Sequence, residues 1–307
     1  MSEYPIQSLS ICCPGIKCIN NCKTCTARQH TNPYENKYHG SYRDAREYWD
    51  DLIKRMRYAQ SVGCKTVVLT GTNEPQQDRR WLEGLYLAMK SLPEPFVNIE
   101  MQTTGAMLML HDFVPFLKEI GVTTIALSIF SIDREKNAEV MGRTEGKVDV
   151  GELCNRIRSY GLNIRMCFNV TDKLLNETWL SKFPDRTEYV KMNAMHLLHI
   201  AECWGADQVT FRKMWSVPGT PEHDWIQANT EYSEKFLSVV KEIIFRNGVP
   251  VRTLPYGATI YDYNGMSIVI DNDSMAKDTS NTAIKYYIIR ENGKLYCSWD
   301  SKASLIL

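Results

Sequence analysis

Three cysteines with close spacing, Cys18, Cys22 and Cys25, lie near the start of the chain. Thiolate sulfur is a soft ligand that suits iron–sulfur clusters, zinc or copper(I). A structural site has all its coordination positions filled by the protein, whereas a catalytic site keeps one position open. The three thiols therefore indicate a metal site with one open position, or a closed zinc site that Cys12, Cys13 or a histidine completes.

The C-x3-C-x2-C spacing, directly after a first predicted strand, resembles the motif of the radical S-adenosylmethionine (radical SAM) enzymes. This resemblance implies that Cys18, Cys22 and Cys25 hold a [4Fe–4S] cluster and that SAM binds its fourth iron. It also implies that SAM is cleaved reductively to a 5′-deoxyadenosyl radical, which abstracts hydrogen from a substrate. Thr24 stands where many members of this family carry an aromatic residue, so the resemblance does not extend to adenine packing.

The composition sets limits on fold and partners. A chain of 307 residues is long enough for one large α/β core or two modest ones. Lys plus Arg and Asp plus Glu are equal at 36 each, which argues against bulk nucleic acid as a partner. No apolar run reaches membrane-spanning length, and the first residues lack the features of a signal peptide. We therefore expect a cytoplasmic protein whose cysteines stay reduced.

Strand-like and helix-like patterns alternate over the first 248 residues. The predicted strands are 7–13, 65–70, 97–103, 123–129, 162–170 and 208–214, and the predicted helices are 44–62, 78–91, 108–120, 133–160, 187–204 and 229–247. Such alternation predicts a parallel sheet. The pattern alone fits either a doubly wound sheet or an open barrel. The family resemblance implies a partial (β/α)6 barrel of the TIM type.

The pattern changes from residue 249 onward, where short strand-like segments replace the alternation. Asn264-Gly265 and Asn292-Gly293 have the composition of tight hairpin turns. We therefore expect a barrel domain over 1–248 and a small antiparallel β extension over 249–307 that packs on it. Cys297 is the extension's one cysteine, unlike the SPASM and twitch extensions that carry auxiliary clusters. A single cluster is therefore predicted.

The segment after the second predicted strand is Gly71-Thr-Asn-Glu-Pro75. Ligands of α/β barrels gather at the C-terminal ends of the strands, which makes this segment informative. It resembles the Gly-Gly-Glu-Pro motif of the radical SAM family, and this resemblance implies that Gly71, Glu74 and Pro75 bind the amino group of SAM. The alternative is a plain β-to-α turn that Asn73 caps.

Polar residues also end the third, fourth and fifth predicted strands. Gln102 and Thr104 share one face of the third strand, and we expect them to approach SAM or the substrate. The family resemblance implies that Asn169 contacts the SAM ribose, and that Ser128 or Arg165 contacts its carboxylate. Arginine suits a carboxylate because it forms paired, charge-assisted hydrogen bonds. Arg165 has the alternative of a salt bridge to a neighbouring carboxylate.

Two further residues complete the candidate site. Cys167 shares a face with Asn169 but lies one layer deeper. Some radical SAM enzymes use such a thiol to return a hydrogen atom to a product radical, although free cysteine is also commonly a buried core residue. Arg212 on the sixth strand is predicted to contact SAM or an anionic substrate.

The resemblance implies an oxygen-sensitive radical SAM enzyme that acts on a small-molecule or nucleotide-type substrate. A rearrangement, an epimerisation or a dehydration would fit. Its electrons would come from an external donor of the flavodoxin or ferredoxin type. A peptide- or protein-modifying radical SAM enzyme is the alternative within the family. A zinc-stabilised binding module is the alternative from another class.

Overall fold

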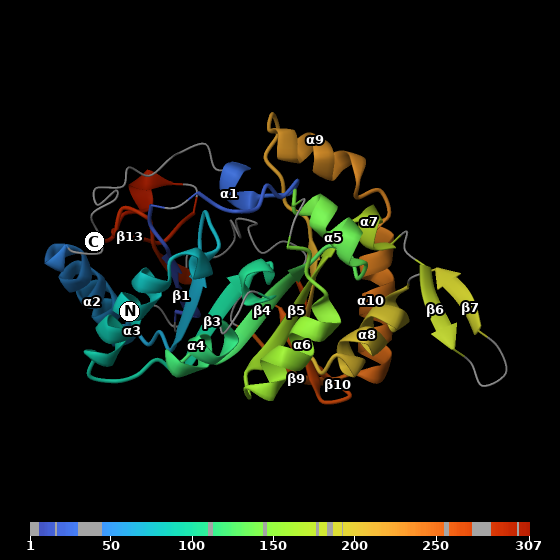
Figure 1. The fold of residues 1–307 in the computed structure, drawn as a ribbon, viewed down its shortest axis with the longest axis horizontal. Helices are drawn as coiled ribbons and strands as arrows, with labels where there is room; N and C mark the ends of the chain where they lie inside the picture. Colours follow the sequence, from blue (N-terminus) through green and yellow to red (C-terminus); the bar gives the residue numbers. More distant parts are fainter. Residues whose placement is uncertain are drawn as a thin grey trace.

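The structure is a computed structural model of the chain, and its fold is a single large sheet lined with helices (Figure 1). It describes residues 6–15, 17–29, 45–109, 113–143, 146–175, 178–182, 187–191, 193–254, 258–271, 284–299 and 301–307. The large sheet has eleven strands in the order β13-β12-β1-β2-β3-β4-β5-β8-β11-β10-β9, and a second sheet pairs β6 with β7. The large sheet ends in two different strands, so it does not close into a full barrel.

The centre of the large sheet consists of six parallel strands, as the alternating pattern predicted. They are β1 (Ser8–Cys12), β2 (Thr66–Thr70), β3 (Asn98–Thr103), β4 (Thr124–Ile129), β5 (Asn163–Val170) and β8 (Gln208–Lys213). Because the strands are parallel, all their C-terminal ends meet at one edge of the sheet. The loops that carry the predicted ligands therefore lie together.

The helices of the described residues connect these strands. They are α1 (Thr26–Gln29), α2 (Arg46–Ser61), α3 (Arg79–Lys90), α4 (Phe113–Glu119), α5 (Arg134–Val140), α6 (Val150–Ser159), α7 (Asp172–Leu175), α8 (Ala194–Cys203), α9 (Pro221–Ala228) and α10 (Ser233–Asn247). Short 3-10 turns are η1 (Pro75–Gln77), η2 (Ala106–Met109) and η3 (Lys302–Ser304). No helix among the described residues combines the length and apolar character that a membrane-spanning segment needs.

Helices α2 to α6 and α10 fall inside the predicted helical stretches, whereas the predicted helix 187–204 is wrong over its first part. The Asn193 side chain accepts a hydrogen bond from the backbone N–H of His196 at 3.1 Å, so it caps α8, which begins at Ala194. The residues before this cap belong to a hairpin of β6 (Thr178–Lys182) and β7 (Thr187–Lys191). This hairpin stands apart from the main sheet (Figure 1).

The two faces of the parallel strands differ in chemistry, and this decides between the open barrel and the doubly wound sheet. One set of alternating side chains belongs to the apolar core shared with the helices, and its members include Val67, Leu69, Ile99, Met101, Ile125, Leu127, Ile164, Met166, Phe168, Val209 and Phe211. The other set is mostly polar and borders a cavity. Helices therefore cover one face of the strands, as in a partial barrel, and the predicted fold class is confirmed.

The C-terminal strands extend the central sheet at both of its edges. Beyond β8 lie β11 (Met266–Asp271), β10 (Thr259–Tyr263) and β9 (Val249–Thr253), and beyond β1 lie β12 (Tyr286–Ile289) and β13 (Leu295–Tyr296). The hairpins within this part are antiparallel, as predicted. However, β11 pairs in parallel with β8, and β12 pairs in parallel with β1. The division into domains at residue 249 stays a prediction.

A buried hydrogen bond joins helices α2 and α3. The fully buried indole N–H of Trp81 donates to the hydroxyl of Tyr48 at 2.9 Å. We expect Tyr48→Phe to lower the free energy of unfolding by about 1–3 kcal/mol, because it leaves a buried donor without an acceptor. Urea denaturation measures this change. Tyr232→Phe, at a residue that is 51% exposed, is the control and should have no measurable effect.

Candidate functional site

A cavity of about 340 Å³ lies at the C-terminal ends of the parallel strands. Its walls come from the strand ends, the cysteine loop and the C-terminal part of the chain. The lining residues are Ser10, Cys22, Thr24, Cys25, Thr26, Ala27, Thr70, Gly71, Thr72, Gln102, Thr104, Ser128, Phe130, Asn169, Arg212, Lys213, Met214, Trp215, Arg290 and Trp299. Eight predicted site residues thus meet around one space, namely Cys22, Cys25, Gly71, Gln102, Thr104, Ser128, Asn169 and Arg212.

Five predicted site residues are not among those that line the cavity: Cys18, Glu74, Pro75, Arg165 and Cys167. Glu74 and Pro75 lie beside Gly71, where the chain leaves β2 and enters the 3-10 turn η1. Pro75 is the first residue of that turn and fixes its backbone.

The loop that carries the cysteines, residues 17–25 (hereafter the cysteine loop), has little regular structure, and side chains from the turn after β2 hold its first half. The backbone N–H of Ile19 donates to Gln77 Oε1 at 3.0 Å, and Gln77 Nε2 donates to the carbonyl of Lys17 at 2.9 Å. Asn20 Nδ2 donates to Glu74 Oε1 at 3.0 Å. The segment predicted to bind the cofactor therefore also fixes the cysteine loop.

Glu74 is a buried carboxylate that accepts hydrogen bonds from three residues in two parts of the chain. Besides Asn20, its donors are the hydroxyl of Thr103 at 2.6 Å and the backbone N–H of Thr104 at 3.0 Å. Burial raises the pKa of Glu74, and these hydrogen bonds act in the opposite direction. The carboxylate thus ties the cysteine loop to the ends of β2 and β3.

The end of helix α5 holds the second half of the cysteine loop. The backbone N–H groups of Asn21 and Lys23 donate to the carbonyls of Met141 and Val140 at 2.9 and 2.8 Å. Gly142 packs directly under this contact with a φ of +63°, and a Cβ added there would lie 2.4 Å from the Asn21 carbonyl oxygen. Only glycine fits this close approach without displacing the loop.

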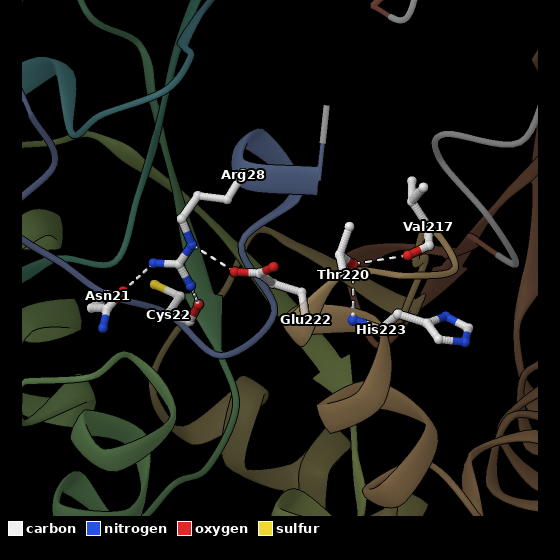
Figure 2. A network of polar contacts seen from close by, with 7 residues as sticks. All are labelled: Asn21, Cys22, Arg28, Val217, Thr220, Glu222 and His223. Carbon is white, nitrogen blue, oxygen red and sulfur yellow. Dashed lines mark hydrogen bonds and ion pairs between the residues drawn. The ribbon is translucent and has the colours of Figure 1, made fainter. Parts of the chain in front are cut away.

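Arg28, at the end of the short helix α1, contacts both the cysteine loop and helix α9 (Figure 2). Its guanidinium donates to the Asn21 side chain and to the carbonyl of Cys22. Its Nε donates to Glu222 Oε1 of α9 at 2.6 Å. The next residue, Gln29, accepts a hydrogen bond from the backbone N–H of Val217 at 2.7 Å.

The three thiols of the cysteine loop influence one another electrostatically. Burial, followed by the nearby charges of Cys25, Glu74 and Cys18, raises the pKa of the Cys22 thiol to about 12. Burial is also the main reason that the pKa of Cys18 is raised. Metal coordination would favour the thiolate form because it places a cation between these sulfurs. The donor set therefore fits a soft metal such as the iron of a cluster.

In the described structure, Cys18, Cys22 and Cys25 are not arranged as the ligands of one metal ion. No three His, Cys, Asp or Glu side chains of the described residues are arranged so that they could hold a metal ion. None of Cys18, Cys22 and Cys25 is in a disulfide, and each is partly exposed. The fit of these cysteines to a metal therefore rests on the chemistry and the spacing of the three thiols.

Arg165 pairs with a neighbouring carboxylate, which is the alternative that the sequence left open for it. Its Nη1 lies 2.5 Å from Glu100 Oε2, and its Nε donates to Gln208 Oε1 at 2.6 Å. Gln102 donates to Glu100 at 3.3 Å and accepts from Thr70 at 3.0 Å. A chain of polar side chains therefore crosses the inner face of the sheet, with Gln102 at its cavity end.

Cys167 and Asn169 share the inner face of β5, but only Asn169 reaches the cavity. Cys167 is 5% exposed and lies level with Ser128 of β4 and Thr210 of β8. The role of Cys167 as a hydrogen-atom donor stays a prediction.

The cavity also has a wall that the sequence did not reveal. Arg290 follows β12, and its guanidinium lies 5.0 Å from the ring centre of Trp299. Both residues line the cavity because β12 pairs with β1, the strand that leads into the cysteine loop. The sequence held one signal for this wall, the hairpin turn at Asn292-Gly293. The turn predicts that Arg290 and Trp299 lie close together, but it does not indicate which edge of the large sheet they join.

Positive charge predominates in this cavity. Its lining includes Arg212, Lys213 and Arg290 and, among the described residues, no carboxylate. Lys213 is paired with Glu234, and Arg290 lies 3.3 Å from Glu291. The Nε of Arg212 is buried and makes no hydrogen bond within the described structure. Buried donors normally have acceptors, so an anionic ligand group would satisfy this one.

The family model described as "Radical SAM superfamily" matches residues 13–180, which include the cysteine loop and strands β2 to β5. A search of the curated proteins gave no match.

Solved structures with a similar fold cover most of this chain. SuiB of Streptococcus suis, bound to the precursor peptide SuiA, is 16% identical with a TM-score of 0.56, over 96% of this chain and 59% of that chain. The anSMEcpe structure with bound AdoMet is 14% identical with a TM-score of 0.61, over 98% and 77%. Methylornithine synthase (PylB) is 15% identical with a TM-score of 0.50, over 78% and 62%. The chain thus spans about three fifths of the SuiB chain, and identities this low establish a shared fold only.

The close contact between Gly142 and the cysteine loop can be tested by substitution. We expect Gly142→Ala to displace the Asn21 carbonyl and to lower the iron bound per chain at least twofold after anaerobic reconstitution. Gly265→Ala is the matched control, because Gly265 also has a positive φ, of +81°, but has no atom within 4 Å of an added Cβ. Equal iron contents in the two variants would show that the contact does not position the loop.

Proposed function

The chain belongs to the radical SAM superfamily, and we propose that it is an enzyme in which Cys18, Cys22 and Cys25 hold a [4Fe–4S] cluster beside a SAM-binding cavity. The observation that carries this proposal is that the cysteine loop and the polar strand ends border one cavity. When bound, the cluster and SAM supply reductive cleavage of SAM and a radical able to abstract hydrogen from a substrate. The protein's part is to bind, orient and exclude water.

The polar residues at the strand ends are proposed to bind SAM, because they face the same space as Cys22 and Cys25. They are Gly71, Gln102, Thr104, Ser128 and Asn169. Gly71 has a φ of +134°, and an added Cβ would lie 3.0 Å from Cys12 Cβ, so only glycine fits this turn beside β1 without strain. Glu74 and Pro75 support this role by fixing the loop that Gly71 begins.

We further propose a small anionic substrate, either a carboxylate or a phosphate such as that of a nucleotide. The buried, unsatisfied Nε of Arg212 supports this, together with the absence of carboxylates from the described lining. Arg290 and Trp299 offer a guanidinium and an aromatic face on the opposite wall. Charge-assisted hydrogen bonds from arginine are among the strongest contacts to such groups.

A peptide substrate is the alternative, and it is favoured by the likeness in fold to SuiB, which was solved with its precursor peptide.

The proposal also includes an external one-electron donor of the flavodoxin or ferredoxin type, and it includes sensitivity to oxygen. The rival from another class remains a zinc-stabilised binding module. Metal analysis separates it from the enzyme.

Replacement of a single cysteine tests the metal centre. We expect Cys22→Ala to lose the broad iron–sulfur absorbance of the reconstituted protein and the formation of 5′-deoxyadenosine from SAM under reductant. Cys203→Ser is the control, because Cys203 is exposed on α8, away from the lining of the cavity, and it should keep both. A colourless wild-type protein that holds one zinc would favour the binding module instead.

Paired compounds test the proposed charge of the substrate. Nucleoside monophosphates are compared with nucleosides, and carboxylic acids with their amides, as stimulants of 5′-deoxyadenosine formation. We expect stimulation by the anionic member of a pair, and a loss of about tenfold or more in Arg290→Gln, as expected for a charge-assisted hydrogen bond of about 1.5–3 kcal/mol. Stimulation by peptides alone, or by both members of each pair equally, would contradict an anionic small-molecule substrate.

A further inference from the structure

The ion pair between Arg28 and Glu222 joins α1, which directly follows the cysteine loop, to helix α9 (Figure 2). Arg28 lies three residues after Cys25, whereas Glu222 lies in the first turn of α9, between β8 and α10. The 2.6 Å contact therefore links the loops after the first and the last of the six parallel strands. Gln29 and Val217 provide a second link between the same two segments.

Glu222 is placed to act through its charge. Its side chain is only 8% exposed, whereas that of Arg28 is 40% exposed. A carboxylate is costly to bury unless a partner compensates its charge, and the partner here is Arg28. Thr220 caps the helix through the backbone N–H of His223 at 3.2 Å, so the first turn that carries Glu222 has a fixed backbone (Figure 2).

Arg28 also lies close enough to Cys22 to influence the charge on its sulfur. The guanidinium donates to the Cys22 carbonyl and to the Asn21 side chain, so its positive charge lies beside the backbone of the cysteine loop. A positive charge at this place stabilises negative charge on the sulfur ligands, and the Glu222 carboxylate offsets it. The reduction potential of an iron–sulfur cluster depends on nearby charge and hydrogen bonds, because the reduced form carries one more negative charge.

We propose that Glu222 is a positioning residue that holds Arg28 against the cysteine loop and, by offsetting its charge, keeps the reduction potential of the cluster low. A lower potential makes the reduced cluster a stronger one-electron donor. This inference rests on the proposed function, since it assumes a [4Fe–4S] cluster at Cys18, Cys22 and Cys25. Glu222 lies on α9, some 200 positions after the cysteine loop in the sequence, and would thereby influence the electron-transfer step.

The test is a redox titration of the reconstituted protein, followed by the electron paramagnetic resonance signal of the reduced cluster. Glu222→Gln keeps a side-chain oxygen for Arg28 Nε but removes the negative charge, so the potential should shift to more positive values. Arg28→Gln removes the positive charge and should shift it to more negative values. The double variant should return close to the wild-type potential. Glu83→Gln, which removes a carboxylate paired with Arg79 on the surface of α3, should leave it unchanged.

The direction of the shifts separates a charge effect from a loosened loop. Shifts of the same sign in Glu222→Gln and Arg28→Gln would overturn the proposal, as would a wild-type potential in Glu222→Gln at full iron content. If Glu222→Gln holds no cluster but Glu222→Asp does, the pair acts on assembly alone and the proposed effect on potential is wrong. A wild-type protein without an iron–sulfur spectrum would instead contradict the proposed function itself.

Discussion

The candidate site depends on hydrogen bonds to one buried carboxylate. Glu74 accepts from Asn20 of the cysteine loop, from the Thr103 hydroxyl and from the Thr104 backbone, so it fixes an irregular loop relative to two strands. The cysteine loop cannot supply this rigidity itself, because it forms few backbone hydrogen bonds of its own. A buried carboxylate with several donors has a well-defined position, since any displacement would leave desolvated polar groups unpaired. Glu74 therefore fixes the first half of the cysteine loop, and the contacts of α5 and Arg28 hold the second half.

The alternation of side chains along the six strands accounts for the rest of the site. One set packs with the helices in the apolar core, and the other set brings Gln102, Ser128, Asn169 and Arg212 to the same cavity. The open edge next to β1 gives the C-terminal hairpin its place, so that Arg290 and Trp299 reach a space whose other lining residues come from the first 215 residues. The six central strands and the C-terminal strands thus contribute different walls.

Local patterns predicted the alternating strands and helices and the meeting of polar strand ends at one edge, because both follow from periodicity and from the geometry of parallel strands. The open barrel and the roles of the strand-end residues came from the resemblance to the radical SAM family, and those roles stay predictions. The same reasoning could not choose between Arg165 as a ligand and its ion pair with Glu100, since that depends on a neighbouring strand. Helix α8 was predicted too long because the cap at Asn193 is a weaker signal than the apolar periodicity around it. Arg290, Trp299 and the Arg28–Glu222 pair depend on contacts between residues far apart in the sequence, which no local pattern records.

The parallel pairing of β1 with β12 also bears on how the chain acquires its structure. Ser8 pairs with Tyr286, so one edge of the first strand finds its partner only after almost the whole chain is available. Contacts of such long sequence separation form slowly, and an uncovered strand edge is prone to pair with other chains. The strand that precedes the cysteines would therefore keep one edge unpaired until residues 286–289 are available.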